Sequence, residues 1–195
     1  MGNSNKNISN FAVIDTETTW LDKVMSIGIV IADSESFELT DKKYYILTPF
    51  KNQGGMYSNA LYAGGIKPDM ECPRDEAMLD IICFLEDNSV ADIYAYNAAF
   101  DCKHLPELQM YNWYDIMRLA AYKQFNSKIP PDADLYSTGK LKRGYGVENI
   151  YRMLSGNNKY CEMHNALQDA VDELEIMRML GFKTERYYAA KIAAS

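Results

Sequence analysis

The chain has 195 residues, 48% of them hydrophobic, which fits one compact domain with a sizeable core. The formal net charge of −7 is the opposite of the basic balance expected of a protein that grips duplex nucleic acid through its phosphates. The four cysteines form no Cys-x-x-Cys pair, no apolar run approaches the roughly 20 residues that span a bilayer, and the first ten residues lack a signal-peptide core. These features predict a reduced, cytoplasmic protein without a membrane segment.

Strands and helices alternate along the chain, which is typical of α/β folds. Five strands are expected, because β-branched and aromatic residues gather in five short runs: 11–14, 26–32, 43–48, 92–96 and 113–117. The second and third should pair antiparallel across the polar stretch between them.

Helices are expected between and after these strands. The clearest begins at Pro73, because the apolar residues that follow it repeat at i, i+3, i+4 and i+7 and so form a face that can pack on a sheet. The others are a short helix ending near Pro106, one leading from the fifth strand through Phe125, and helices at 147–154 and 166–180. Prolines and glycines in 126–144 predict a surface loop or insertion there.

Asp15 and Glu17 form the first candidate motif, directly behind the first strand. Residues two apart on an extended chain point to one face, so the two carboxylates should emerge together. Carboxylate oxygens are the ligands that Mg²⁺ and Mn²⁺ prefer. Because Asp-x-Glu is a common tripeptide, the segment taken alone is equally well explained as a polar turn that ends the strand.

The second motif, Asn97-Ala98-Ala99-Phe100-Asp101, directly follows the fourth strand. Asn97 is expected to cap a helix, which would place Asp101 in the first turn at the carboxyl end of the strand, where open α/β sheets bind ligands. Phe100 is expected to pack inward. Taken alone, Asp101 is better explained as a solvated helix residue.

The third motif places His164 five residues before Asp169. Asn165 and Gln168 have the spacing of a capping box, so a helix should begin at Ala166, with His164 in the preceding loop and Asp169 in the first turn. An imidazole beside a metal-bound carboxylate is suited to taking a proton from water near neutral pH. Taken singly, His164 could be a loop histidine bonded to backbone, and Asp169 could be an acidic residue that the helix dipole stabilises.

In this order and on these elements, the three motifs resemble those of the DEDDh 3′-to-5′ exonucleases, the RNase H-like group that includes the proofreading subunit of the bacterial replicative polymerase, RNase T and oligoribonuclease. A sister group has Tyr four residues before the last Asp; Asn165 stands there, so the histidine branch is the match. The resemblance implies an α/β, RNase H-like three-layer fold with a five-stranded mixed sheet flanked by helices. It places an exonuclease domain at 11–182, between a polar extension at 1–10 and a tail at 183–195.

The resemblance also implies the chemistry. Two divalent cations, Mg²⁺ or Mn²⁺, would be held by Asp15, Glu17, Asp101 and Asp169, with His164 as the general base. The reaction implied is hydrolysis of phosphodiester bonds at the 3′ end of single-stranded DNA or RNA, with release of nucleoside 5′-monophosphates by a two-metal-ion mechanism.

Substrate contacts are also carried over from the resemblance. Thr18 and Leu21 match positions that in the family often touch the terminal sugar and base. Trp20 stands where the family commonly has Gly; it could stack on a base, but packing under the loop is slightly favoured. Asn97 is the expected polar contact, because Tyr96 replaces a His that often precedes it. Phe100 is a further candidate contact.

Several features are ambiguous in the sequence. The basic run 140–143 could reach a strand backbone, although such runs are more often solvated. Asp172 and Glu173 are expected to be surface acids and His104 structural. The tail could fray or cover a neighbour.

Three functions are compatible with the motifs: a free-standing enzyme trimming single-stranded ends, a proofreading subunit bound to a separate polymerase, or a binding module that has lost activity. The motifs leave the choice between DNA and RNA open. A Met- and Tyr-rich surface could support a homodimer.

Overall fold

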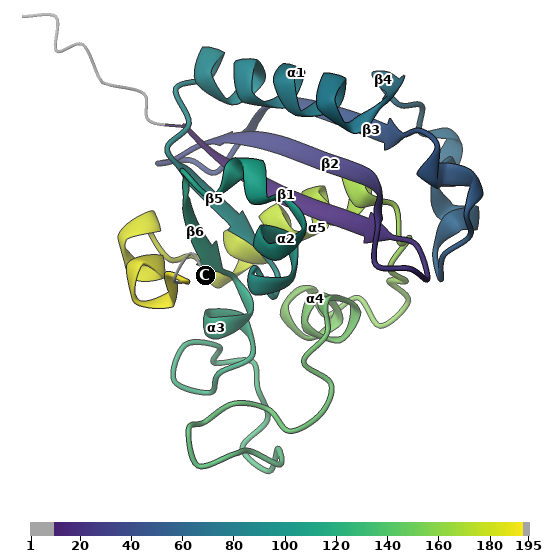
Figure 1. Ribbon diagram of the computed structural model, residues 1–195. Helices are drawn as coiled ribbons and strands as arrows, with labels where there is room; N and C mark the ends of the chain where they lie inside the picture. The colour runs from purple at the N-terminus through teal and green to yellow at the C-terminus, as the bar shows by residue number, and fades with distance from the viewer. Residues whose placement is uncertain (1–9, 193–195) are drawn as a thin grey trace, which may run out of the picture.

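The computed structural model describes residues 10–192, which form a mixed sheet of six strands in the order β4-β3-β2-β1-β5-β6 (Figure 1). β1 pairs antiparallel with β2 and β2 with β3, whereas β4, β5 and β6 add in parallel. The strands are β1 (Asn10–Thr18), β2 (Val24–Asp33), β3 (Leu39–Leu47), β4 (Met70–Cys72), β5 (Asp92–Ala95) and β6 (Asn112–Asp115).

The expectation of five strands was wrong by one, because β4 was missed. Its three residues pair in parallel with the end of β3, from Tyr45 opposite Met70 to Leu47 opposite Cys72. A strand this short carries too few residues to show an alternating pattern, so only pairing with β3 reveals it.

Helices cover both faces of the sheet (Figure 1). α1 packs against β3 and β4, and α5 packs against β1 and β2 on the opposite face. The helices are α1 (Arg74–Asp87), α2 (Ala99–His104), α3 (Met117–Ala120), α4 (Val147–Ser155) and α5 (Ala166–Leu180). None of the helices within residues 10–192 has the length and apolar character to cross a membrane.

The helix expected to run through Phe125 ends at Ala120 instead. The Asn126 side chain is buried and its Nδ2 donates to the carbonyl oxygen of Ala120 at 2.8 Å, which satisfies an acceptor at the end of α3. The chain then turns away from the helix axis. The helices predicted at 147–154 and 166–180 are confirmed within one residue at each end by α4 and α5, and α1 begins directly after Pro73, where a helix was expected to begin.

The alternation of side chains along β1 decides on which side of the sheet each residue at its carboxyl end lies. The apolar residues of β1 alternate between the core layer that includes α5 and the layer that includes α1. Continuing this alternation beyond Ile14 places Asp15 and Glu17 on the α5 side and Thr16 on the other.

Gly28 lets the start of α5 lie directly on the sheet. A Cβ at Gly28 would come within 2.1 Å of the carbonyl oxygen of Ala166 and within 2.3 Å of the backbone nitrogen of Leu167. Gly28 is also the residue opposite Asp15 in the β1–β2 register. The close contact therefore brings the first turn of α5 beside the acidic end of β1.

The described part of the C-terminal tail covers the edge of the sheet at β6. Tyr187 is fully buried and its ring meets that of Tyr94 edge-on, with centroids 5.5 Å apart. The backbone N–H of Ile192 donates to the carbonyl of Trp113 at 2.9 Å. Residues 193–195, and the expected N-terminal extension up to residue 9, lie outside the described chain.

Candidate active site

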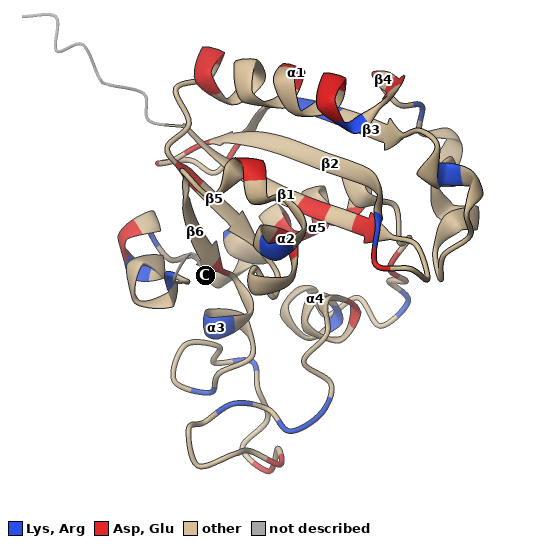
Figure 2. Cartoon of the chain, viewed as in Figure 1, with Lys and Arg blue, Asp and Glu red and all other residues tan. Residues whose placement is uncertain are grey.

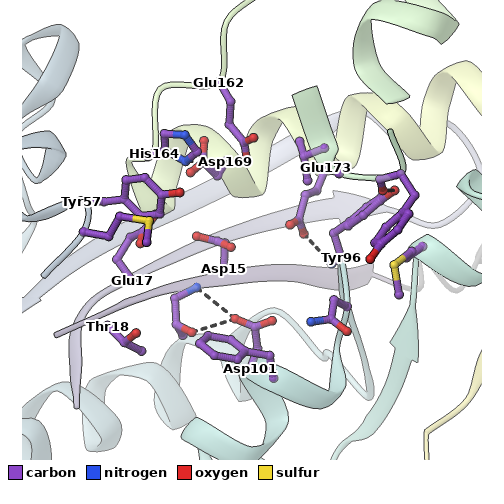
Figure 3. A pocket seen from close by; sticks show the side chains of 18 of the residues that line it. Asp15, Glu17, Thr18, Tyr57, Tyr96, Asp101, Glu162, His164, Asp169 and Glu173 are labelled. Atoms are coloured by element: carbon purple, nitrogen blue, oxygen red, sulfur yellow. Dashed lines mark hydrogen bonds and ion pairs between the residues drawn. The ribbon is translucent and has the colours of Figure 1, made fainter. Parts of the chain in front are cut away.

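The three sequence motifs meet in a cleft of about 650 Å³ at the carboxyl end of β1 (Figure 3). Carboxylates from β1, α2, α5 and the loop before α5 line it, and His164 lies at one end. The acidic lining residues are Asp15, Glu17, Asp101, Glu162, Asp169 and Glu173. The structure thus brings together all five predicted catalytic residues.

β1 supplies Asp15 and Glu17. Asp15 Oδ2 is buried and accepts no hydrogen bond from the described residues. Burial, reinforced by the neighbouring carboxylates, raises the pKa of Asp15 well above its usual range. Burial and the charge of Asp169 raise the pKa of Glu17 to about 9. The end of β1 therefore holds two carboxylates that are costly to ionise without a compensating positive charge.

α2 supplies Asp101, which Thr16 holds against β1. The backbone N–H and the Oγ1 hydroxyl of Thr16 donate to Asp101 Oδ1 at 3.1 and 2.7 Å. Burial raises the pKa of Asp101 to about 7, and these hydrogen bonds oppose the rise. Because side chains alternate along β1, Asp15 faces the α5 side and Thr16 faces the other side. Thr16 can therefore bind Asp101 at the same end of the strand.

Two expectations about this motif were wrong. Asn97 does not cap a helix: its φ is +64°, α2 begins two residues later, and its own N–H donates to Asp115 Oδ1 at 2.9 Å. Phe100 does not pack inward; its side chain is 39% exposed and lines the cleft. The conformation of Asn97 differs from the expectation because Asp115 on β6, a partner distant in sequence, accepts its backbone N–H.

Asn165 caps α5, as predicted. Its side-chain oxygen accepts from the Gln168 N–H at 3.3 Å, and its Nδ2 donates to the carbonyls of Ala60 and Leu61, both at 3.0 Å. The Gln168 side chain donates to Asp172 at 2.9 Å. The buried Asn165 therefore ties the start of α5 to the segment between β3 and β4.

His164 stands in the loop that this cap positions. Its φ is +55°, and its ring stacks on Tyr57 with centroids 3.8 Å apart. Burial lowers the pKa of His164, which keeps the ring neutral near pH 7. Its Nδ1 lies 4.0 Å from Glu162 Oε1. The imidazole is thus oriented by a ring contact and available as a proton acceptor.

Asp169, in the first turn of α5, completes a compact group of potential ligands. One ligand atom each from Glu17, His164 and Asp169 lies within 4.8 Å of the other two. Asp169 Oδ1 is buried without a hydrogen-bond partner among the described residues, as is Asp15 Oδ2. Buried carboxylate oxygens left unpaired are costly, and a divalent cation would satisfy them. The donor set therefore fits such an ion.

Two acids that were expected on the surface are buried, and that expectation was wrong. Glu173 is 2% exposed, faces the cleft, and accepts the Tyr96 N–H through Oε2 at 3.0 Å. Asp172 accepts from the Tyr160 hydroxyl. A signal was available for Glu173, because a residue four after Asp169 lies on the same side of the helix.

Tyr57 and Glu162 also line the cleft and were not singled out from the sequence. Tyr57 comes from a stretch of short 3₁₀ turns between β3 and β4, where no periodicity points to a site. Glu162 lies two residues before His164, and its proximity to that motif is the only sequence signal for it.

All of the predicted substrate contacts except Leu21 line the cleft. Thr18 and Asn97 line the cleft. Trp20 also lines it and is 68% exposed, so the preference for packing under the loop was wrong. Leu21 is 72% exposed and lies outside the lining. His104, expected to be structural, is buried and bonds the Phe100 carbonyl and Asp22 at 2.8 Å each.

Solved structures share this architecture. Exonuclease X in complex with 5′ overhanging duplex DNA matches with a TM-score of 0.57 and 19% identity, over 92% of this chain and 98% of that chain. The nuclease domain of 3′hExo, a DEDDh family member bound to rAMP, matches with a TM-score of 0.60 and 16% identity, over 90% and 94%. E. coli Exonuclease I in complex with a dA16 oligonucleotide matches with a TM-score of 0.60 and 14% identity, over 93% and 42%.

No protein-family model matches the chain, and no curated protein matches it in sequence. At these identities the structural matches establish the fold. The chain has the RNase H-like α/β fold of DEDDh 3′-exonucleases, with its mixed sheet flanked by helices, and the predicted fold class is confirmed with one strand added.

Proposed function

We propose that the protein is a metal-dependent 3′-to-5′ exonuclease that shortens single-stranded DNA or RNA and releases nucleoside 5′-monophosphates. One observation carries the proposal: Asp15, Glu17, Asp101, Asp169 and His164, from three distant segments, converge in one cleft of a fold shared with known 3′-exonucleases.

The proposed cofactors are two divalent cations, Mg²⁺ or Mn²⁺, held by the four carboxylates of that set. The unpaired buried oxygens of Asp15 and Asp169 support this assignment. When bound, such ions neutralise the carboxylates, polarise the phosphodiester and lower the pKa of water. With the carboxylates neutralised in this way, a polyanion can enter a cleft that is otherwise strongly acidic.

His164 is the proposed general base. Its ring is one-third exposed, so water can reach it, and its lowered pKa leaves the ring neutral and able to accept a proton near pH 7. Tyr57 holds the ring in one orientation at the edge of the carboxylate group. Proton removal from an attacking water is the step these features support.

Exposed rings at the rim of the cleft support a single-stranded substrate. Trp20 and Phe100 both line the cleft and expose large apolar surface. Unpaired bases stack on such rings whatever their sequence, whereas bases in a duplex are already stacked. Thr18 and Asn97 add polar groups to the same lining, and Leu21, which follows Trp20 in the chain, is exposed outside the lining.

The test is digestion of DNA and RNA strands that carry a fluorophore at the 5′ end, with Mg²⁺, with Mn²⁺ or with EDTA. We expect a ladder that shortens from the 3′ end with either ion and no digestion with EDTA, and 5′-monophosphates in the products. The H164A variant is the matched control, since contaminating nuclease would survive that substitution. Strands left intact after long incubation with both ions would overturn the proposal.

A further inference from the structure

The segment between α3 and α4, of which 126–144 was expected to be a surface loop or insertion, is held in place by residues buried in the main core and by backbone pairing. Leu141 and Ile129 are buried in the same core layer as α5. The Leu141 N–H donates to the carbonyl of Ala121 at 2.9 Å, and the Lys123 N–H to that of Gly139 at 3.0 Å. The segment therefore presents a defined surface, which extends from the body of the protein below α3 (Figure 1).

Tyr96 connects this segment to the candidate active site. Its hydroxyl donates to the carbonyl of Tyr145, and its backbone N–H donates to the carboxylate of Glu173 inside the cleft. Tyr145 and Gly146 in turn line the cleft. The residue that replaces the family's usual His thus fixes the end of the segment against the site.

The surface of this segment is basic in an otherwise acidic protein. Residues 136–146 contain Lys140, Lys142 and Arg143 and no acidic residue, and Figure 2 shows basic residues along the lower loops. Lys142 pairs with Asp134 at 2.9 Å, whereas Lys140 and Arg143 have no ion pair among the described residues. Two of the three cations are therefore available to an anionic ligand.

Lys140 links the basic surface with the cleft. It is the one lysine or arginine among the described lining residues, and its Nζ lies over the Tyr145 ring, 4.5 Å from the centroid. This cation–π contact orients the ammonium group and leaves its charge unneutralised. A strand leaving the cleft on this side meets positive charge at once.

We propose that Lys140 and Arg143 bind the phosphodiester backbone of a single strand upstream of the 3′-terminal nucleotide. These two residues, together with the Tyr145 ring that orients Lys140, are called here the basic ridge. The inference rests on the proposed function for the direction of the strand. It adds a second binding site, whose ligand is the backbone of the same strand and which raises affinity for longer substrates. Phosphate contacts of this kind position a strand without reading its sequence.

The experiment compares the double variant K140Q/R143Q with K42Q/K183Q, which removes the same charge from exposed residues outside the cleft. Binding of a fluorescent strand of about 20 nucleotides is measured by anisotropy against salt concentration, with Ca²⁺ present so that binding is separated from turnover. Matched DNA and RNA strands form two arms, and the conservative variant K140R/R143K tests whether charge alone suffices.

For wild type and K42Q/K183Q we expect equal dependence of the dissociation constant on salt. For K140Q/R143Q the slope of log Kd against log salt concentration should fall by about 1.4, because each phosphate contact to a single strand contributes about 0.7 to that slope. The loss of affinity should grow with strand length, and K140R/R143K should restore it. Equal slopes for the two Gln double variants would overturn the inference and identify the run as a solvated face.

Failure of the proposed function is distinguishable. A wild-type protein that binds strands through the basic ridge but releases no mononucleotide contradicts the exonuclease proposal and supports the ridge. If the wild-type protein digests strands but both Gln double variants show equal salt slopes, the exonuclease proposal is supported and the basic ridge is contradicted.

Discussion

The ring of Tyr57 stacks on the ring of His164, with centroids 3.8 Å apart and planes 12° apart. His164 has a φ of +55°, an uncommon conformation for a residue with a side chain, so its orientation depends on surrounding contacts. Tyr57 comes from the segment between β3 and β4, which carries no motif. The stack therefore makes that segment part of the support for the proposed general base.

Removing the Tyr57 ring should slow turnover and shift its pH dependence. We expect Y57A to lower kcat by on the order of 10- to 100-fold, because a displaced base loses alignment with water. Less burial should raise the pKa of His164, so the acidic limb of the kcat/KM profile should move to higher pH. Y57F keeps the ring and should retain both values; an unshifted profile in Y57A would contradict the positioning role.

Replacing His164 should separate catalysis from metal binding. We expect H164A to lower kcat by about 10²- to 10⁴-fold, which is the usual contribution of a general base, with Mn²⁺ affinity nearly unchanged in calorimetry. D15N should lose both. Because His164 also lies in the compact group with Glu17 and Asp169, loss of Mn²⁺ binding in H164A would instead identify it as a ligand.

The metal-free protein should become less stable as pH rises. Glu17, Asp101 and Asp169 have pKa values raised to about 9, 7 and 8, so the folded state binds more protons than the unfolded state. The stability that these protonated carboxyl groups contribute is fully present below the unfolded pKa of about 4. It is lost as pH rises through their folded-state pKa values. In EDTA, Tm should therefore fall steadily from about pH 5 to about pH 9.

Divalent cations should reverse that loss. Mn²⁺ or Mg²⁺ binds the ionised carboxylates, so the increase in Tm on adding either ion should be larger at the alkaline end of the range. D15N/D169N is the matched control, since it removes the unpaired oxygens and should show little response to the ions. An increase in Tm that does not depend on pH would contradict the carboxylate assignment.

Glu173 should act through its hydrogen bond and not through its charge. Burial raises its pKa well above the usual range, so E173Q removes little charge and keeps the acceptor for the Tyr96 N–H. We expect E173Q to fold with an unchanged or higher Tm. E173A leaves that N–H unpaired, and its free energy of unfolding should drop by about 1–3 kcal/mol in chemical denaturation. Loss of Mn²⁺ affinity in E173Q would show instead that Glu173 is a ligand.

Gly28 should tolerate no side chain. A Cβ there would meet backbone atoms of Ala166 and Leu167 at 2.1 to 2.3 Å, so G28A must push α5 away from the sheet. We expect its free energy of unfolding to fall by about 3 kcal/mol, together with loss of Mn²⁺ binding. Gly146 has open space around its Cβ position and a φ of −72°, so G146A is the matched control for stability.

Local patterns in the sequence were sufficient for five of the six strands, for α1, α4 and α5, and for the four carboxylates and the histidine that converge in the cleft. Alternation on β1 places Asp15 and Glu17 on one face, and the Asn165 cap places Asp169 in the first turn of α5. Both arise from interactions within a few residues, so the sequence alone contains them. The order of the three motifs was then enough to predict the fold, which the structural matches confirm.

Only the tertiary structure decided what depends on contacts between distant segments. Tyr57 meets His164, Gly28 meets Ala166, and Tyr96 meets both Glu173 and Tyr145 across the fold. The exposure of Trp20 and the burial of Glu173 follow from the same packing. These relations are set by which surfaces meet when the layers close, and neither residue type nor periodicity encodes that choice locally.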